Sequence, residues 1–427
     1  MKKIKQISNF IFAATIIFFI QGCVKDTCKH SYTYARFTPV YTTIAEVRQN
    51  IKSSVATAIK APGKMFVIGN YIFLNEINKG IHVINNSNPA APQNVGFINI
   101  PGNVDVAVKG NILYADMYSD LVALNISNPL QVVKTAIVDN VFPNRSYNGN
   151  FYNYNQGKII TDWVRSDTTI IDDCTQNQNP IWFTDGSGIF TLQSTLGSTA
   201  SNSFAGGAPT GIAGSMARFA LVQNVLYTVG QNELKVININ NAANPIVSNT
   251  VSLAWGIETI YPFKDKLFIG GSNGMYMYNI NNLYNPTQLG TFTHARVCDP
   301  VIADDDFAYV TLRNGSMCTG FLNELNVVDI SNIMAPSLQK KYDLFNPHGL
   351  SKDGNLLFVC DGIDGIKVFD ATDRQNLILK KQIANIDSYD VIAYNGLMIV
   401  TAADGLYQFN YTNANNIIQI SKIAITQ

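Results

Sequence analysis

A short strand-like phrase that recurs along this chain constrains its fold more than any other sequence feature. Its seven copies read IHVIN, LVALN, LKVIN, MYMYN, LNVVD, IKVFD and LYQFN, and they begin at residues 81, 121, 234, 275, 325, 366 and 406. An Asn-Pro or Ala-Pro turn follows five of them. Repetition of this kind indicates one supersecondary unit copied along the chain.

The spacing of the copies predicts the architecture. Most copies lie 40 or 41 residues apart, and two longer intervals of 50 and 113 residues imply inserts of 9 and 72 residues. Without these inserts, residues 59–427 amount to seven units. Repeats of this length with four strands each are typical of β-propeller blades, which stack around an axis because one sheet cannot bury both of its faces alone. We therefore expect an all-β, seven-bladed β-propeller with four-stranded blades.

The first 22 residues have the pattern of an export signal. Three lysines precede an apolar run of 11 residues at 10–20, which is too short to span a bilayer stably. The following Ile20-Gln21-Gly22-Cys23 resembles a bacterial lipobox, which implies lipidation of Cys23 and anchoring in a membrane. Val24 is not the aspartate associated with inner-membrane retention, so the resemblance implies the outer membrane, facing either the periplasm or the cell surface. The alternative is an ordinary cleaved signal with an incidental cysteine.

Between this signal and the propeller, residues 23–58 are expected to form a lipidated tether and a short helix. Apolar residues at 44, 47 and 51 have helical spacing, and residues 55–59 resemble an outer strand. The large insert, at 141–214, contains a predicted hairpin of 158–163 with 168–171 and then a Ser/Gly-rich stretch. We interpret the insert either as a variable loop or as a ligand or partner surface.

The repeated phrase and its turns resemble the LVIVD-repeat family of bacterial surface lipoproteins. The resemblance covers roughly residues 59–427 apart from the large insert, and the stretch at 62–85 adds to it. It implies a propeller, but members of the family share no agreed biochemical activity.

Composition limits the partners. Charged residues make up 14% of the chain and the formal net charge is zero, which argues against nucleic acid because phosphate binding needs a clustered basic surface. Apolar residues make up 47%, enough to bury a sizeable core. The sequence has no phosphate-binding loop, HExxH, GxSxG or dinucleotide motif, so we expect no cofactor. We also expect a monomer.

Alignment of the repeats places one ionisable residue near the start of each innermost strand. These predicted ligand-binding residues are Lys64, Asp105, Arg218, Glu258, Asp299, His348 and Asp390. Innermost strands line the central channel, so the seven are expected to form a polar ring at one mouth, where converging charges can bind a polar ligand. Their mixed signs argue against a metal site. The alternative is that they are merely hydrated residues of the channel wall.

Two acidic motifs and the cysteines complete the candidate sites. The Asp304-Asp305-Asp306 run and the 361–365 segment could suggest calcium, but both fit turns better, so we predict no metal site. Cys298 and Cys318 are a candidate disulfide in an exported protein, and Cys360 in an apolar strand is a candidate buried thiol.

Two functions follow from these features. The first is a non-catalytic, lipid-anchored module that binds a protein or a glycan. The second is a hydrolase or lyase acting on an extracellular polymer, with His348 as acid or base together with Asp299, Asp390 or Glu258. A plugged or splayed channel mouth would count against the enzyme.

Overall fold

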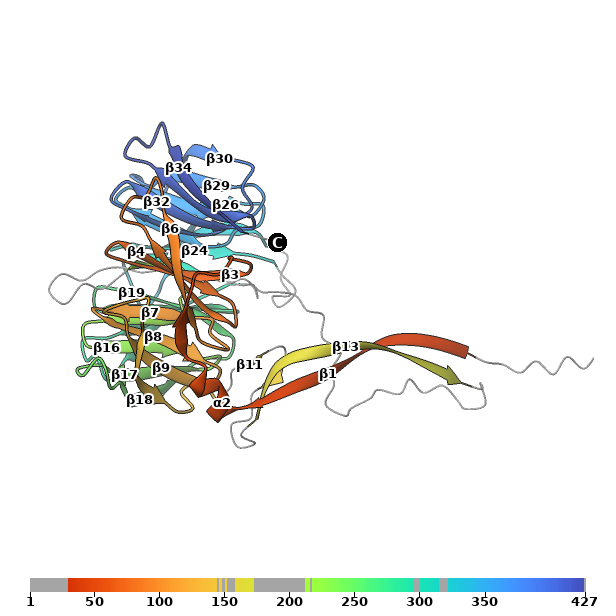
Figure 1. The fold of residues 1–427 in the computed structure, drawn as a ribbon. Coiled ribbons are helices and arrows are strands. Elements are labelled where there is room, and N and C mark those ends of the chain that lie inside the picture. The colour runs from red at the N-terminus through yellow and green to blue at the C-terminus, as the bar shows by residue number, and fades with distance from the viewer. Residues whose placement is uncertain are drawn as a thin grey trace, which may run out of the picture. The chain divides into compact units, whose positions relative to one another are not determined.

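The computed structural model describes residues 30–143, 146–147, 150–151, 158–172, 212–215, 217–294, 300–314 and 322–425. The chain divides into two compact units, one of residues 1–40 with 161–190 and one of residues 41–160 with 191–427. The second unit contains the blades (Figure 1). Across the described ranges, no helix is both long and apolar enough to cross a membrane.

Seven antiparallel sheets follow one another along the chain, and within each sheet the strands pair in sequence order. Blade 1 has β3 (Pro62–Ile68), β4 (Tyr71–Glu76), β5 (Gly80–Asn85) and β6 (Gln93–Asn99); blade 2 has β7 (Val106–Lys109), β8 (Ile112–Met117), β9 (Asp120–Asn125) and β10 (Val133–Val138); blade 3 has β15 (Phe219–Val222), β16 (Val225–Val229), β17 (Glu233–Asn238) and β18 (Ile246–Ser252); blade 4 has β19 (Ile257–Phe263), β20 (Lys266–Gly271), β21 (Gly274–Asn279) and β22 (Thr287–Thr293).

The remaining three blades have the same pattern. Blade 5 has β23 (Val301–Ala303), β24 (Phe307–Leu312), β25 (Glu324–Asp329) and β26 (Ser337–Asp343); blade 6 has β27 (Leu350–Asp353), β28 (Leu356–Cys360), β29 (Ile366–Asp370) and β30 (Ile378–Ile383); blade 7 has β31 (Ser388–Tyr394), β32 (Leu397–Ala402), β33 (Gly405–Asn410) and β34 (Ile418–Ala424). The predicted all-β fold with seven four-stranded blades is confirmed.

Blade 1 gains a strand at each edge. The short β2 (Lys52–Ser54) pairs with the outer strand β6, and β14 (Ile212–Ala213) pairs with the inner strand β3. The expected outer strand at 55–59 is wrong: the pairing lies earlier in the chain, and Val55 is 82% exposed. Residues 55–60 instead carry the chain from the outer edge of blade 1 to the start of β3.

The predicted helix is confirmed as α2 (Ile44–Gln49). Thr43 and Glu46 form a capping box, in which Thr43 Oγ1 accepts from the Glu46 amide at 3.2 Å and the Glu46 carboxylate accepts from the Thr43 amide at 2.8 Å. Such reciprocal caps satisfy two amides that the first turn of a helix leaves unpaired. Val47 is buried, and Arg48 donates to Asp120 on β9 at 2.5 Å, so the helix packs on blade 2.

The remaining regular elements are β1 (His30–Thr43) and β13 (Lys158–Asp172), which pair as a two-stranded sheet, and a small pair of β11 (Ser146–Tyr147) with β12 (Asn150–Phe151). The hairpin predicted at 158–163 with 168–171 is wrong, because residues 158–172 form one continuous strand. Residues 164–167, where the turn was expected, are part of this strand, which pairs with β1.

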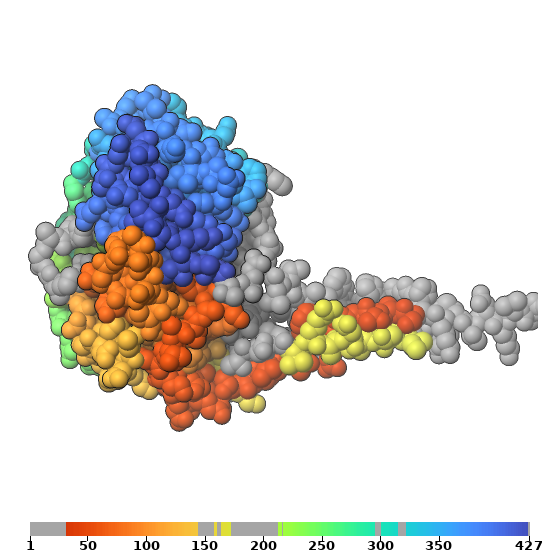
Figure 2. All heavy atoms as spheres, turned by 45° about the horizontal axis from the view of Figure 1, so that its top comes forward, coloured from red at the N-terminus to blue at the C-terminus, as the bar shows by residue number. Residues whose placement is uncertain are grey.

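The core lies between neighbouring blades. Each blade buries both faces of its middle strands, and the last blade packs on the first through a cluster that includes Met65, Leu74, Ile392 and Ile399. Figure 2 shows the dark blue surface of blade 7 meeting the orange surface of blade 1. The seven sheets therefore form a closed ring.

Candidate functional site

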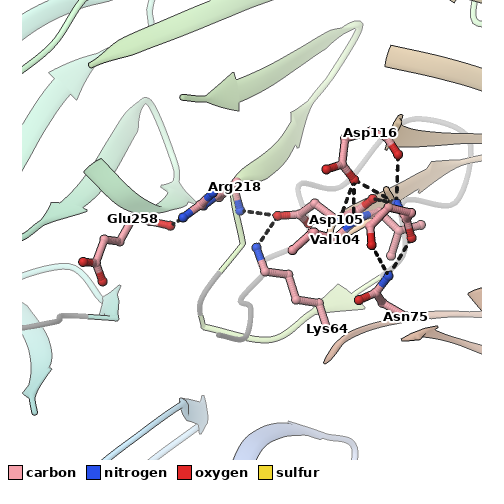
Figure 3. A network of polar contacts seen from close by, with 9 residues as sticks. Lys64, Asn75, Val104, Asp105, Asp116, Arg218 and Glu258 are labelled. Carbon is pink, nitrogen blue, oxygen red and sulfur yellow. Dashed lines mark hydrogen bonds and ion pairs between the residues drawn. The ribbon is translucent and has the colours of Figure 1, made fainter. Parts of the chain in front are cut away.

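The inner strands bring three of the predicted ring residues together. Lys64 on β3 and Asp105 just before β7 form a buried ion pair, with side-chain exposures of 4% and 0%. The same Asp105 carboxylate accepts a hydrogen bond from the main-chain amide of Arg218 at 2.9 Å. Blades 1, 2 and 3 are thus joined at their innermost ends (Figure 3). A buried carboxylate with these partners is held in place by both an ion pair and a main-chain hydrogen bond.

A second polar layer orients Asp105. Asp116 Oδ1, at the end of β8, accepts from the amides of Val104 at 2.9 Å and Asp105 at 2.7 Å. It also accepts from Asn103 Nδ2 at 2.8 Å, and Asn75 Nδ2 donates to Asn103 Oδ1 at 2.6 Å (Figure 3). We did not single out these residues in the sequence. A signal was nevertheless present in the sequence. Asn75 and Asp116 each stand in an apolar strand, two residues after an aromatic residue, and a polar side chain buried there needs a hydrogen-bond partner.

The segment before β15 contacts three blades other than its own. It pairs with β3 through β14, Ser215 Oγ accepts from the Leu350 amide of blade 6 at 2.6 Å, and the Ala217 carbonyl accepts from the Ile260 amide of blade 4 at 2.6 Å. The side chains of Ala213, Ser215 and Ala217 are buried. Residues 212–215 and 217–218 therefore bridge the inner strands of blades 1, 4 and 6, which lie apart in the sequence.

Next to this segment, Glu258 lies among arginines. Arg218 Nε donates to the main-chain oxygen of Glu258 at 3.3 Å, and Figure 3 shows the Glu258 carboxylate pointing away from that contact. Burial raises the pKa of the Glu258 carboxyl, and the charges of Arg218, Arg313 and His294 oppose this shift. Burial also lowers the pKa of Arg313, which follows β24. The repeat alignment did not identify Arg313, because it compared residues near the start of the innermost strand of each blade. Arg313 follows the second strand of its blade.

His348 lies before β27, and the whole residue is only 5% exposed. Its Nε2 lies 3.1 Å from Asn346 Nδ2, and its ring packs at 5.4 Å from that of Tyr389. Burial, with the charge of Arg313 as a second cause, lowers the pKa of His348 to about 3. The imidazole is therefore neutral at physiological pH, so it cannot act as a general acid in its protonated form.

Two ring predictions remain, Asp390 and Asp299. Asp390 is fully buried on β31, where its Oδ1 lies against the backbone of Gly349. Asp299 is outside the described residues. Among the residues described, the structure joins Lys64, Asp105 and Arg218, and it places Asp390 beside Gly349, the residue after His348. Their ligand-binding role stays a prediction.

The acidic motifs serve structure. Residues 304–306 form the turn between β23 and β24, as predicted, and Asp304 also links blades 5 and 6, because it accepts from Arg374 Nε at 2.9 Å and pairs with Lys352 at 3.2 Å. Asp361 opens a turn, as predicted, and its buried carboxylate accepts from the amides of Phe345 and Asn346, both at 2.9 Å. Within the described ranges, no three His, Cys, Asp or Glu side chains converge as metal ligands would.

Of the cysteines, the structure describes Cys360 alone. It is a fully buried free thiol on β28, as predicted, and burial raises its pKa. A thiol in such surroundings is inert. The lipidation candidate Cys23 and the candidate pair Cys298 and Cys318 fall outside the described residues.

Comparison with known proteins supports the fold. The LVIVD repeat model matches residues 63–99, 102–139 and 297–344. A solved structure of a protein from Lactobacillus plantarum is 12% identical, with a TM-score of 0.52 over 87% of this chain and 95% of that chain. The periplasmic gluconolactonase of Pseudomonas aeruginosa is 10% identical, with a TM-score of 0.51 over 88% of this chain and 96% of that one.

At these identities the two structures show a common fold and nothing about activity. No curated protein matches the chain. The repeat model, by contrast, falls on blades 1, 2 and 5, in the segments that carry the phrase from which the propeller was predicted. The chain therefore has a β-propeller structure, in which three blades match the LVIVD repeat.

Proposed function

We propose that the protein is a lipid-anchored module of the cell envelope that binds a protein or a glycan without catalysis. The supporting observation is the state of the channel mouth. Residues 212–215 and 217–218 bridge the inner strands of three blades there, Asp105 is paired with Lys64 and the Arg218 amide, and burial lowers the pKa of His348 to about 3. General acid–base catalysis is most efficient with a pKa near the working pH, and His348 is far from it.

The competing function is a polymer hydrolase or lyase. Burial raises the pKa of Glu258, as in carboxyls that act as general acids. Such enzymes use a second carboxylate at a set distance across the scissile bond. Of the two other acids predicted at the mouth and described here, Asp105 is tied to Lys64, and Asp390 lies against Gly349.

Anchoring and location rest on the leader, which resembles that of an outer-membrane lipoprotein. Growth with a labelled fatty acid should label the protein, and Cys23→Ala should abolish the label. Cell fractionation should then place the protein in the outer membrane, and protease added to intact cells distinguishes surface from periplasmic display. Absence of label from the wild-type protein would contradict the anchor.

The binding function is tested with the full chain extracted in detergent and immobilised. Arrays of envelope glycans and envelope proteins should yield a ligand that is retained and recovered chemically unchanged, as judged by mass spectrometry. Shortened or unsaturated products from a bound polymer would establish the enzyme in its place. Glu258→Gln separates the two, since it should stop turnover if Glu258 is a general acid.

A further inference from the structure

Two polar contacts fix the register of the ribbon that β1 forms with β13 (Figure 1). Thr33 Oγ1 lies 2.9 Å from Thr169 Oγ1, and Ser166 Oγ donates to the main-chain oxygen of Arg36 at 3.5 Å. The residue numbers rise on β1 as they fall on β13, so the two strands are antiparallel. Residues 31–34 therefore lie opposite residues 168–171, and we call this end of the ribbon, where β1 begins, the tip.

The tip exposes large apolar side chains. Tyr32 is 48% exposed and Ile171 is 65% exposed, while Tyr34 and Ile170 are half-buried. Because successive side chains point to opposite faces of a strand, Tyr32 and its cross-strand neighbour Ile170 share one face, and Ile171 lies on the other. Two strands alone cannot cover either face, and such ribbons are marginally stable in water. A surface that takes up these side chains would therefore stabilise the ribbon.

Beyond the tip the ribbon becomes charged. Arg36 is exposed, and at ~3.3 Å per residue it lies about 13 Å from Tyr32 along β1. Arg165 and Asp167 on β13 form an ion pair at 3.2 Å, with side-chain exposures of 64% and 60%. An apolar end that contains tyrosines, followed by a charged stem, suits a structure whose end enters a membrane interface while its charges stay in water or reach lipid phosphates.

The position of Cys23 indicates which surface covers the tip. His30, the first residue of β1, is seven residues after Cys23. A chain spans at most ~3.6 Å per residue, so His30 lies within about 25 Å of Cys23. With Cys23 lipidated, the tip is held beside the bilayer at a high effective concentration. The bilayer is thus the apolar surface that the chain itself keeps next to the tip.

The edges of the ribbon limit how deeply it can enter. In the described sheets β1 and β13 pair only with one another, so each has one edge without a strand partner. Backbone groups at such edges are costly in hydrocarbon, where no water can bind them. The headgroup layer keeps them hydrated, and it also suits tyrosine, which has an apolar ring and a hydroxyl that takes a polar partner.

We propose that the tip, residues 31–34 with 168–171, is a second membrane contact, which inserts into the headgroup layer of the bilayer that holds the Cys23 lipid. The inference rests on the lipid anchor of the proposed function and adds a protein surface that meets lipid. A lipid on a short tether leaves the ribbon free to turn, whereas two attachments fix its direction. The large insert contributes to this contact, because β13 supplies Ile170 and Ile171.

The test uses the lipidated protein in vesicles of phosphatidylethanolamine and phosphatidylglycerol that contain a lipid with a photoreactive group at the headgroup boundary. After irradiation and trypsin digestion, mass spectrometry locates the lipid adducts. Cleavage after Lys29 and Arg36 releases peptide 30–36 with both tyrosines of the tip. Cleavage after Lys158 and Arg165 releases peptide 159–165, which carries the 56% exposed Val164 of the stem. Adducts should concentrate on peptide 30–36.

Substitutions on β13 are read out on the β1 peptide, so that the labelled residues stay unchanged. The double variant Ile170→Ser, Ile171→Ser should lower the adduct yield on peptide 30–36 at least about tenfold, because two large apolar side chains no longer favour the interface. The matched control is Val164→Ser, a similarly exposed residue of the same strand about 20 Å from Ile170. It should leave the yield unchanged.

Hydrogen exchange on β1 and β13 checks that each variant keeps the ribbon paired, and Ile171→Ser alone replaces the double variant if that one does not. Equal labelling of the two peptides, or equal losses in the control and the double variant, would overturn the tip contact and leave the lipid anchor standing. A wild-type protein without lipid would contradict the anchor. In that case, labelling of peptide 30–36 on added vesicles, lost in the double variant, would still support the tip contact, and its absence would overturn it.

Discussion

A glycine stands at or just before the first residue of the third strand in four blades, and the structure gives the physical reason. A Cβ atom built on Gly80, Gly274, Gly365 or Gly405 would lie 2.1, 2.5, 2.0 or 2.9 Å from a main-chain oxygen of the neighbouring fourth strand. Only some of these glycines have positive φ, so close approach of the next strand is the shared requirement. Asp120, Glu233 and Glu324 take this position in the other blades, and each pairs with a cation.

The close approach of the fourth strand predicts that alanine substitutions at two glycines should lower the free energy of unfolding by different amounts. Gly365 and Gly354 both have positive φ, of +89° and +55°, but a Cβ on Gly354 meets nothing within 4 Å. Gly354→Ala should therefore cost about 1–2 kcal/mol of unfolding free energy from its backbone conformation. Gly365→Ala should cost clearly more, because β30 must also move away from the new methyl group. Urea unfolding of both variants measures the difference, and equal losses would contradict the close-approach explanation.

His348 predicts a specific acid sensitivity. Burial, and secondarily Arg313, lowers its pKa to about 3 in the folded protein, whereas the unfolded chain has a value near 6.5. The unfolded state thus binds the proton more readily, so this group lowers stability as pH falls from about 6.5 to 3, at roughly 1.4 kcal/mol per pH unit. His348→Gln should remove that slope, as measured by urea unfolding between pH 7 and pH 4. Parallel pH profiles of variant and wild type would refute this assignment.

The turn after each third strand is built by asparagine or aspartate, and proline is dispensable. Asn85 Oδ1 accepts from the Ser87 amide at 3.0 Å, Asp370 Oδ1 from Thr372 at 2.9 Å, and Asn410 Oδ1 from Thr412 at 2.9 Å. Asp370 and Asn410 belong to the two copies that lack proline. The side chain takes over a main-chain hydrogen bond of the turn, which explains why this position of the phrase is always Asn or Asp.

The same observation predicts which changes a turn tolerates. Asn85→Ala should lower the unfolding free energy by about 1 kcal/mol, the typical net value of one such hydrogen bond. Asn85→Asp should be close to neutral, since Asp370 already performs this role in blade 6. Thermal unfolding with both variants measures the contrast. A larger loss for aspartate than for alanine would show that the amide group of Asn85 is needed.

The elements that sequence reasoning found are those with local causes. The repeated strands, the turns that follow them and the short helix at 44–49 depend on neighbouring residues, and all were predicted. The pairing of β1 with β13 joins segments more than a hundred residues apart and has no local signature. Alignment of the repeats found Lys64, Asp105 and Arg218 as neighbours. It did not find Arg313, or the contacts of residues 212–215 and 217–218 with blades 1, 4 and 6, because neither lies at a position that the repeats share.

The ring as a whole is closed by side chains. Each blade takes its four main strands from consecutive sequence, so the first and last blades are not joined by a shared strand in the described sheets. Asn86 after β5 and Gln408 on β33 exchange two hydrogen bonds, at 3.0 and 2.7 Å, across this contact. Ser421 Oγ adds a bond to the Pro89 carbonyl at 2.7 Å. Both amides of the exchange are buried, so neither can turn to water when its partner is removed.

A double-mutant cycle on Asn86 and Gln408 therefore tests how the ring closes. Asn86→Ala and Gln408→Ala should each cost about 1–3 kcal/mol, because each leaves a buried amide unsatisfied, and the double variant should cost less than their sum. Hydrogen exchange should rise on β5 and β33 before it rises elsewhere, since opening begins where the ring is joined. Tyr114→Phe, which removes the bond from Tyr114 Oη to the Ala242 carbonyl between blades 2 and 3, is the control at an interface joined by continuous chain. Additive losses in the cycle, or the same exchange pattern in the control, would mean that packing of Met65 and Ile392 closes the ring without help from the amide pair.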